Sequence, residues 1–138
     1  MNKQKGFTII ELIVVIAIIA VLTAIVLVNV TSYINKAKDA KINSNLANMA
    51  TGMASCYAST STYVGCFANT AYIPAALGTD ISTANGGTAA FNTEAAGTFV
   101  ICAKLASDGT KGTCVDSTGV TKNNVTYSGC AGSITACP

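Results

Sequence analysis

Residues 5–28 read KGFTIIELIVVIAIIAVLTAIVLV, and this stretch decides the fold of the 138-residue chain. A lysine and a glycine precede an aromatic residue, after which an unbroken apolar run carries one carboxylate, Glu11. An ionised glutamate costs several kcal/mol inside hydrocarbon, so a carboxylate kept there indicates a functional site. We therefore expect Glu11 to act in whatever process the apolar run serves.

The apolar run is long enough to cross a membrane. From Leu12 to Val28 the only polar side chain is Thr23, and no residue is charged. Counted from Phe7, the run would extend about 33 Å as an α-helix, which spans the hydrocarbon core of a bilayer. A cleaved secretory signal would need a shorter apolar core followed by an A-x-A site. A plain signal anchor is an alternative, but it explains neither Glu11 nor the Gly6–Phe7 junction.

The string Lys5-Gly6-Phe7-Thr8-Ile9-Ile10-Glu11 resembles the processing site of type IV prepilins and the related pseudopilins. The resemblance implies that a prepilin peptidase cuts after Gly6 and that the new N-terminal residue, Phe7, is methylated. It also implies a single-pass precursor in the cytoplasmic membrane that is later packed into an extracellular pilus. The implied partners are copies of the same chain, the peptidase, a pilus assembly ATPase and a membrane platform protein.

Cleavage would give Phe7 an α-amine, a cation that also needs a partner once the apolar segment is buried. Pairing this amine with Glu11 avoids the cost of burying two isolated charges. The resemblance implies that the pair forms between neighbouring subunits, or within one, and sets their axial register. Family members commonly have a helix breaker near the position of Val28 and a glycine near Ala20, and this chain has neither. We therefore expect its helix to unwind less readily inside a fibre.

The helical pattern continues past the membrane-length run to about Tyr57 without a breaker between residues 28 and 45. Apolar residues recur close to a 3.6-residue period, which predicts an amphipathic helix that packs on a domain. These are Ile34, Ala37, Ile42, Leu46, Met49 and Met53. The predicted segments are a leader at 1–6, a polymerisation helix at 7–28, its amphipathic half at 29–57 and a head at 58–138.

The predicted fold class is α+β and pilin-like, with the long helix packed on a small antiparallel sheet. Residues 98–105 are rich in β-formers, and the turn at Ser107-Asp108-Gly109, with glycine in the left-handed region, favours a hairpin to residues 112–116. A third strand is expected around residues 125–127. Residues 58–97 show no sustained period and are expected to be mainly loop.

Six cysteines follow the apolar run, and an even number in a small exported domain indicates disulfides. They are Cys56, Cys66, Cys102, Cys114, Cys130 and Cys137. We predict pairing in chain order, so that 56 joins 66, 102 joins 114 across the hairpin, and 130 joins 137. A zinc site is disfavoured because the chain has no histidine and no C-x-x-C spacing. Disulfides would also place the C-terminal side of the helix outside the cytoplasm.

The sequence offers no catalytic residues, cofactor or metal site. Without histidine there is no Ser-His or Cys-His pair, and no glycine-rich phosphate loop is present. The acids Asp80, Asp108 and Asp116 are too dispersed to favour a calcium site and are better explained as solvated turn residues.

Net charge disfavours a nucleic-acid-binding domain. Loss of Lys3 and Lys5 with the leader would leave six of the eight cationic side chains against six acids. DNA binding through the spread lysines 104, 111 and 122 is an unsupported alternative.

We therefore predict a pilus structural subunit. One alternative is a pseudopilin of a type II secretion system. The other is a signal-anchored extracytoplasmic binding module that never polymerises.

Overall fold

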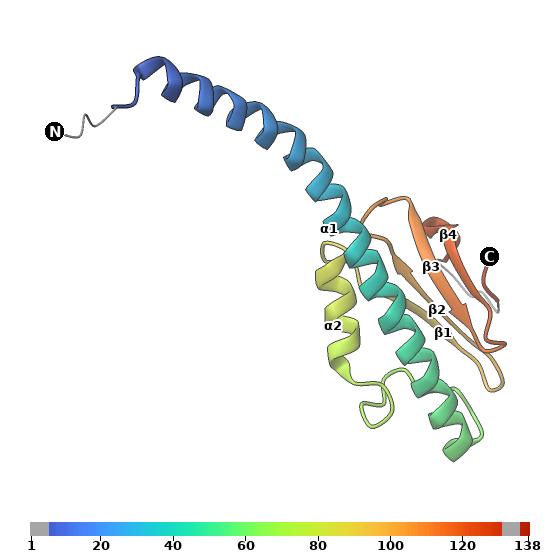
Figure 1. The fold of residues 1–138 in the computed structure, drawn as a ribbon. Coiled ribbons are helices and arrows are strands. Elements are labelled where there is room, and N and C mark those ends of the chain that lie inside the picture. Colours follow the sequence, from blue (N-terminus) through green and yellow to red (C-terminus); the bar gives the residue numbers. More distant parts are fainter. Residues whose placement is uncertain (1–5, 131–135) are drawn as a thin grey trace. The chain divides into compact units, whose positions relative to one another are not determined.

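The computed structural model describes residues 6–130 and 136–138, and the chain divides into an N-terminal unit, residues 1–34, and a head, residues 35–138. Its architecture is the predicted α+β one, a long helix and a four-stranded antiparallel sheet (Figure 1). The elements are α1 (Ile9–Thr60), α2 (Ala75–Ala84), β1 (Phe91–Glu94), β2 (Phe99–Lys104), β3 (Lys111–Asp116), β4 (Thr121–Thr126) and the 3₁₀ turn η1 (Tyr127–Cys130).

Helix α1 is continuous across both units, as the lack of a helix breaker predicts. It extends to Thr60, slightly beyond the predicted end at Tyr57, and it stops where Ser61 adopts a left-handed φ of 58°. A left-handed residue directly after the last helical turn is a common helix terminator.

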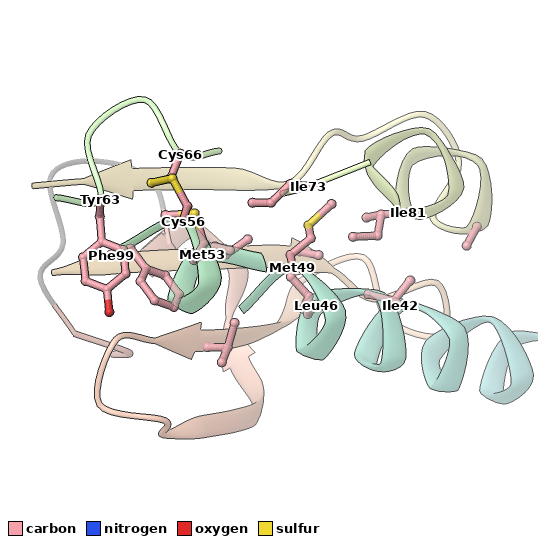
Figure 2. Close-up of a cluster of buried hydrophobic side chains, with 14 residues drawn as sticks. Ile42, Leu46, Met49, Met53, Cys56, Tyr63, Cys66, Ile73, Ile81 and Phe99 are labelled. Atoms are coloured by element: carbon pink, nitrogen blue, oxygen red, sulfur yellow. A yellow bond between two sulfur atoms is a disulfide. The ribbon is translucent and has the colours of Figure 1, made fainter. Parts of the chain in front are cut away.

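The part of α1 in the head buries one face, as its amphipathic pattern predicts. Ile42, Leu46, Met49 and Met53 are each no more than 1% exposed, and they form a core with side chains from α2, β2 and β3 (Figure 2). Ile34 and Ala37, which the pattern also assigned to this stripe, are both exposed, Ile34 by 48%, so the buried stripe begins at Ile42. Figure 1 shows α2 alongside α1, and Lys41 and Asp80 form an ion pair between them at 3.1 Å.

The sheet has the order β1-β2-β3-β4 with every neighbouring pair antiparallel. The predicted hairpin register is confirmed, because Cys102 lies directly opposite Cys114. Strand β4 starts at Thr121, earlier than predicted, and Tyr127 begins η1 instead of ending a strand. Helix α2 and strand β1 both lie in the stretch predicted to be mainly loop.

The hairpin turn differs from its prediction in one detail. Gly109 is not among the described glycines with positive φ. The turn is closed instead by Asp108, whose Oδ1 accepts hydrogen bonds from the backbone N–H of Thr110 at 2.9 Å and from its hydroxyl at 2.7 Å. An aspartate that binds the backbone two residues on forms such a turn without a left-handed glycine.

Strand β2 is buried on both faces, which accounts for its nearly continuous apolar sequence. Phe99, Ile101 and Ala103 face the core shared with α1. Val100 and Cys102 point the other way, into a second cluster that contains cysteines from β3, η1 and the C-terminus. The sheet is therefore a middle layer between α1 and the C-terminal segment.

The cysteine pairing follows this layering and corrects two of the three predicted disulfides. Cys56 bonds to Cys66 as predicted, which ties the end of α1 to the following loop. Cys114 bonds to Cys137, not to Cys102, and Cys130 therefore does not bond to Cys137. The reason is that the C-terminal segment returns over the second face of the sheet, where the backbone N–H of Cys137 donates to Asp116 at 3.1 Å.

Candidate assembly site at the start of the long helix

The start of α1 is closed by a reciprocal pair of side chains, Thr8 and Glu11. Glu11 Oε2 accepts hydrogen bonds from the backbone N–H and the hydroxyl of Thr8, both at 2.8 Å. The backbone N–H of Glu11 donates to Thr8 Oγ1 at 3.3 Å. This is a capping box, in which two backbone donors that have no partner inside the helix are satisfied by side chains. Glu11 is thereby fixed near the helix start, beside the Gly6–Phe7 junction.

The apolar side chains of the N-terminal unit have no cover from the described chain. The large aliphatic residues between Ile9 and Leu27 are each at least 45% exposed, and Phe7 is 81% exposed. Thr23 satisfies its own hydroxyl by donating to the carbonyl of Ile19 at 2.7 Å, so the segment presents hardly any unpaired polar group. By length and composition α1 is able to cross a membrane.

Of the predicted site residues, Gly6 and Phe7 precede the helix and Glu11 lies in its first turn, all of them exposed. The pairing of Glu11 with the α-amine of Phe7 stays a prediction, since that amine exists only after cleavage. Thr8 is the residue that the sequence analysis missed. Its signal was present, because Thr-x-x-Glu before an apolar run is the pattern of a capping box.

Two carboxylates in the head hold loops to the secondary structure instead of forming a reactive site. Asp39 on α1 accepts hydrogen bonds from the backbone N–H of Ala106 at 2.6 Å and of Ser107 at 3.2 Å. Glu94 at the end of β1 accepts from Gly65 at 2.7 Å and Phe67 at 2.6 Å. Asp39 therefore holds the loop at Ala106 against α1, and Glu94 holds the loop at Gly65 against β1.

Asp116 has the same role on the second face of the sheet. It is 4% exposed, and its oxygens accept backbone hydrogen bonds from Thr118, Val120 and Cys137 as well as one from the Thr118 hydroxyl. Burial alone would raise the pKa of Asp116, but these hydrogen bonds outweigh it and lower the pKa below its usual value. Asp116 is therefore held as a carboxylate that organises the C-terminal segment.

The acidic side chains of the head lie apart from one another within the described residues. Over 6–130 and 136–138, no three His, Cys, Asp or Glu side chains gather as metal ligands. Asp80 pairs with Lys41, Asp108 closes its turn and Asp116 binds backbone, so the three acids lie at separate places. A groove of about 240 Å³ between α1, the loop after Cys66 and α2 is lined by residues such as Met49, Phe67 and Ile73, without a titratable side chain.

The N-terminal part of the chain is similar to known proteins. Residues 1–27 match the family model described as the prokaryotic N-terminal methylation motif. The chain has a prepilin-type N-terminus. Over 47 residues it is 51% identical to a type IV major alpha-pilin and, equally, to a fimbrial protein Q, both of Moraxella bovis.

Each of these matches covers 34% of this chain and 30% of the curated relative. No solved structure matches the chain. The similarity to these two proteins is therefore found in the N-terminal part of the chain. The head adds the architecture, since a long N-terminal helix followed by an antiparallel sheet is the predicted pilin-like α+β fold.

Proposed function

We propose that this protein is the structural subunit of a type IV pilus-like filament and has no catalytic role. The observation that carries the proposal is a methylation motif placed at the capped start of a helix whose apolar side chains are exposed throughout its first half. Such a surface needs lipid or other helices around it. A filament of identical subunits supplies those helices once the chain has left the membrane.

Within this proposal, a prepilin peptidase cuts after Gly6 and methylates the amine of Phe7. The precursor waits in the cytoplasmic membrane, with its head on the outer side, where the two disulfides are stable. An assembly ATPase and a membrane platform protein then move the subunit into an extracellular fibre made of copies of itself. Residues 1–6 act as the leader and residues 7–28 as the polymerisation segment.

Glu11 would act in assembly through its charge. The capping box leaves Glu11 Oε1 for a second partner, because Thr8 uses Oε2 for both of its bonds. The new α-amine of Phe7 is a cation of the right kind for this oxygen, either within one subunit or from its neighbour. Burial between helices makes such a pair strongly preferred over two separate charges.

The test is the intact mass of the protein in material sheared from the cell surface. We expect a chain that begins at methylated Phe7, and we expect Glu11→Ala to be processed normally but to be absent from the sheared fraction. Glu11→Gln separates charge from shape, since it retains a hydrogen-bonding group but has no charge to offer the amine. Glu94→Gln is the matched control, a loop-clamping carboxylate in the head whose loss should leave the N-terminal unit unchanged.

Three outcomes would contradict the proposal. A chain that keeps Met1 and stays in the membrane would indicate a signal-anchored module. A processed chain confined to the cell envelope would indicate a secretion pseudopilin. Normal fibres from Glu11→Ala would show that the carboxylate has no part in assembly.

A further inference from the structure

The second face of the sheet holds four of the six cysteines in one buried cluster. The cluster consists of Val100, Cys102, Cys114, Cys130 and Cys137, with Val125 and Tyr127 packed against it. Cys114 and Cys137 form a disulfide, whereas Cys102 and Cys130 are not bonded to any other cysteine. Both of these are almost completely buried, with exposed fractions of 1% and 2%.

Cys102 and Cys130 lie next to each other although they come from different elements. Cys102 is on β2 directly opposite Cys114, and Cys130 ends η1, which packs on β2 and β3. Both side chains belong to the same buried cluster, and each lies close enough to the other to affect its pKa. Two cysteines that share one buried cluster are candidates for a disulfide with each other.

We propose that Cys102 and Cys130 form a third disulfide, which fastens η1 to the central strand beside the Cys114–Cys137 bond. The step joins the two sulfur atoms and releases two protons and two electrons. The electrons reduce an external disulfide, that of a thiol-oxidising enzyme or of a small disulfide such as oxidised glutathione, to two thiols. The inference depends on the proposed function in one respect, because export would place the head in the oxidising compartment that this reaction needs.

Burial dictates when this bond forms. Desolvation raises the pKa of both thiols, and the neighbouring Cys130 raises the pKa of Cys102 further. Because the thiolate is the attacking species, thiols in this state react slowly with an oxidant. The bond therefore closes while the C-terminal segment is still folding, and the native head then protects it from reductants.

The plain alternative is that the two residues are small hydrophobic side chains that fill the cluster as thiols. Metal binding offers no better account, since the neighbouring cysteines 114 and 137 are already joined to each other. The two readings differ in one measurable quantity, the number of thiols that can be alkylated in the denatured, unreduced protein.

The test is a non-reducing tryptic map of the full chain isolated from the cell surface, unfolded with a thiol-blocking reagent at low pH. Cys102 falls in peptide 42–104, Cys114 in 112–122, and Cys130 with Cys137 in 123–138. A third disulfide joins all three peptides into one species with no blocked thiol. Reduction should then raise the intact mass by about 6 Da, at about 2 Da for each disulfide.

The map also separates the other outcomes. If 112–122 is joined to 123–138 while 42–104 carries a blocked Cys102, the inference is wrong although the other disulfides have formed. Blocked thiols at all six positions would overturn the inference together with the oxidising compartment of the proposed function. Bonds from 102 to 114 and from 130 to 137 would join only 42–104 to 112–122, which also contradicts the inference.

Matched single variants confirm the partners. Cys137→Ser should leave 42–104 joined to 123–138 through Cys130 and should expose only Cys114 to the blocking reagent. Cys130→Ser should leave 112–122 joined to 123–138 and expose only Cys102. If Cys130→Ser exposes no thiol beyond those of the parent protein, Cys102 and Cys130 are not partners.

Discussion

The two halves of α1 belong to one continuous helix but depend on different surroundings. In the N-terminal unit, aliphatic side chains project on all sides and are at least 45% exposed between Ile9 and Leu27. In the head, one face from Ile42 to Met53 is buried by the chain's own sheet and loops. The comparison shows that the second half takes its partners from its own chain, whereas the first must receive them from lipid or from other molecules.

The same difference explains where similarity to known proteins is found. The identity of 51% to the type IV major alpha-pilin and to fimbrial protein Q extends over 47 residues in the N-terminal part. Under the proposed function this helix would pack against lipid and then against copies of itself, and its sequence would have to suit both surroundings. A head core tolerates many substitutions that keep its volume and pattern, so its sequence retains less of a family's signature.

The largest expected effect comes from separating the halves. A chain that starts at Asn35 retains the buried core, both disulfides and the whole sheet. We expect it to be monomeric and cooperatively folded without detergent, while the full chain requires detergent. Sedimentation velocity and thermal melting by circular dichroism measure this. An unfolded or aggregated fragment would show that the N-terminal half supports the head.

A smaller effect tests how tightly α1 is packed inside the head. A Cβ at Gly52 would lie 2.5 Å from the carbonyl oxygen of Tyr72 and 2.9 Å from Ile73 Cγ1. The nearest atom belongs to the backbone and cannot easily move aside. Gly52→Ala should therefore lower the free energy of unfolding, by an amount nearer the upper than the lower end of about 1–3 kcal/mol. Urea denaturation of the head measures it.

Gly78→Ala is the matched control for this packing. A Cβ there meets only Met49 Cε, at 3.9 Å, so the better helix propensity of alanine should raise stability by about 0.5–1 kcal/mol. Equal effects at both glycines would mean that the loop at Tyr72 does not press on the helix.

A substitution at Asp116 tests the contacts on the second face of the sheet, and it should change how folding stability depends on pH. Its pKa is lower in the folded than in the unfolded state, so its contribution to stability is present above the unfolded pKa of about 4 and is lost as the pH falls through the folded pKa. Asp116→Asn should cost about 1–2 kcal/mol at pH 7, since an amide cannot accept all four hydrogen bonds.

Urea titrations at pH 7 and pH 3 measure both effects of Asp116. The variant should lose less stability on acidification than the parent protein. The control is Asp80→Asn, which removes an exposed ion pair with Lys41 and should change stability by about 1 kcal/mol or less. If both variants respond alike to acid, Asp116 does not organise the C-terminal segment.

The smallest effect belongs to the helix start. Thr8→Ala removes the hydroxyl of the capping box and should weaken the first turn of α1 by about 0.5–1 kcal/mol. Amide hydrogen exchange of the full chain in detergent should accelerate at residues 9–12, with no change in the melting of the head. Thr8→Ser keeps a hydroxyl and should restore protection. Faster exchange throughout the head would contradict the local role.

The sequence was a sufficient guide wherever a pattern repeats along the chain. The continuity of α1 and its stripe from Ile42 to Met53 follow from periodicity. The register of Cys102 opposite Cys114 is also as predicted, although Asp108 closes the turn in place of a left-handed glycine. The capping box was equally readable from Thr8 and Glu11, although only Glu11 was recognised.

The contacts that could not be predicted join residues far apart in the chain. Strand β1 and α2 are short, and their stability comes from packing on β2 and α1 instead of from their own propensity. The disulfide between 114 and 137 depends on a C-terminal segment that returns across the sheet, which no local pattern encodes. The clamp from Asp39 to the turn at Ala106 is of the same kind.

Two contacts, made by Asp39 and Cys56, hold α1 to the rest of the head, and their positions along the helix have a mechanical consequence. The N-terminal unit is joined to the head through the backbone of α1, so tension on that unit is transmitted to the head through this helix. Asp39 binds the β2–β3 turn near one end of the buried stripe, and Cys56 bonds to Cys66 near the other. A pull along α1 would load these ties and the packed face between them in shear, sharing the force among them. The head should therefore yield to axial tension only when many contacts fail together.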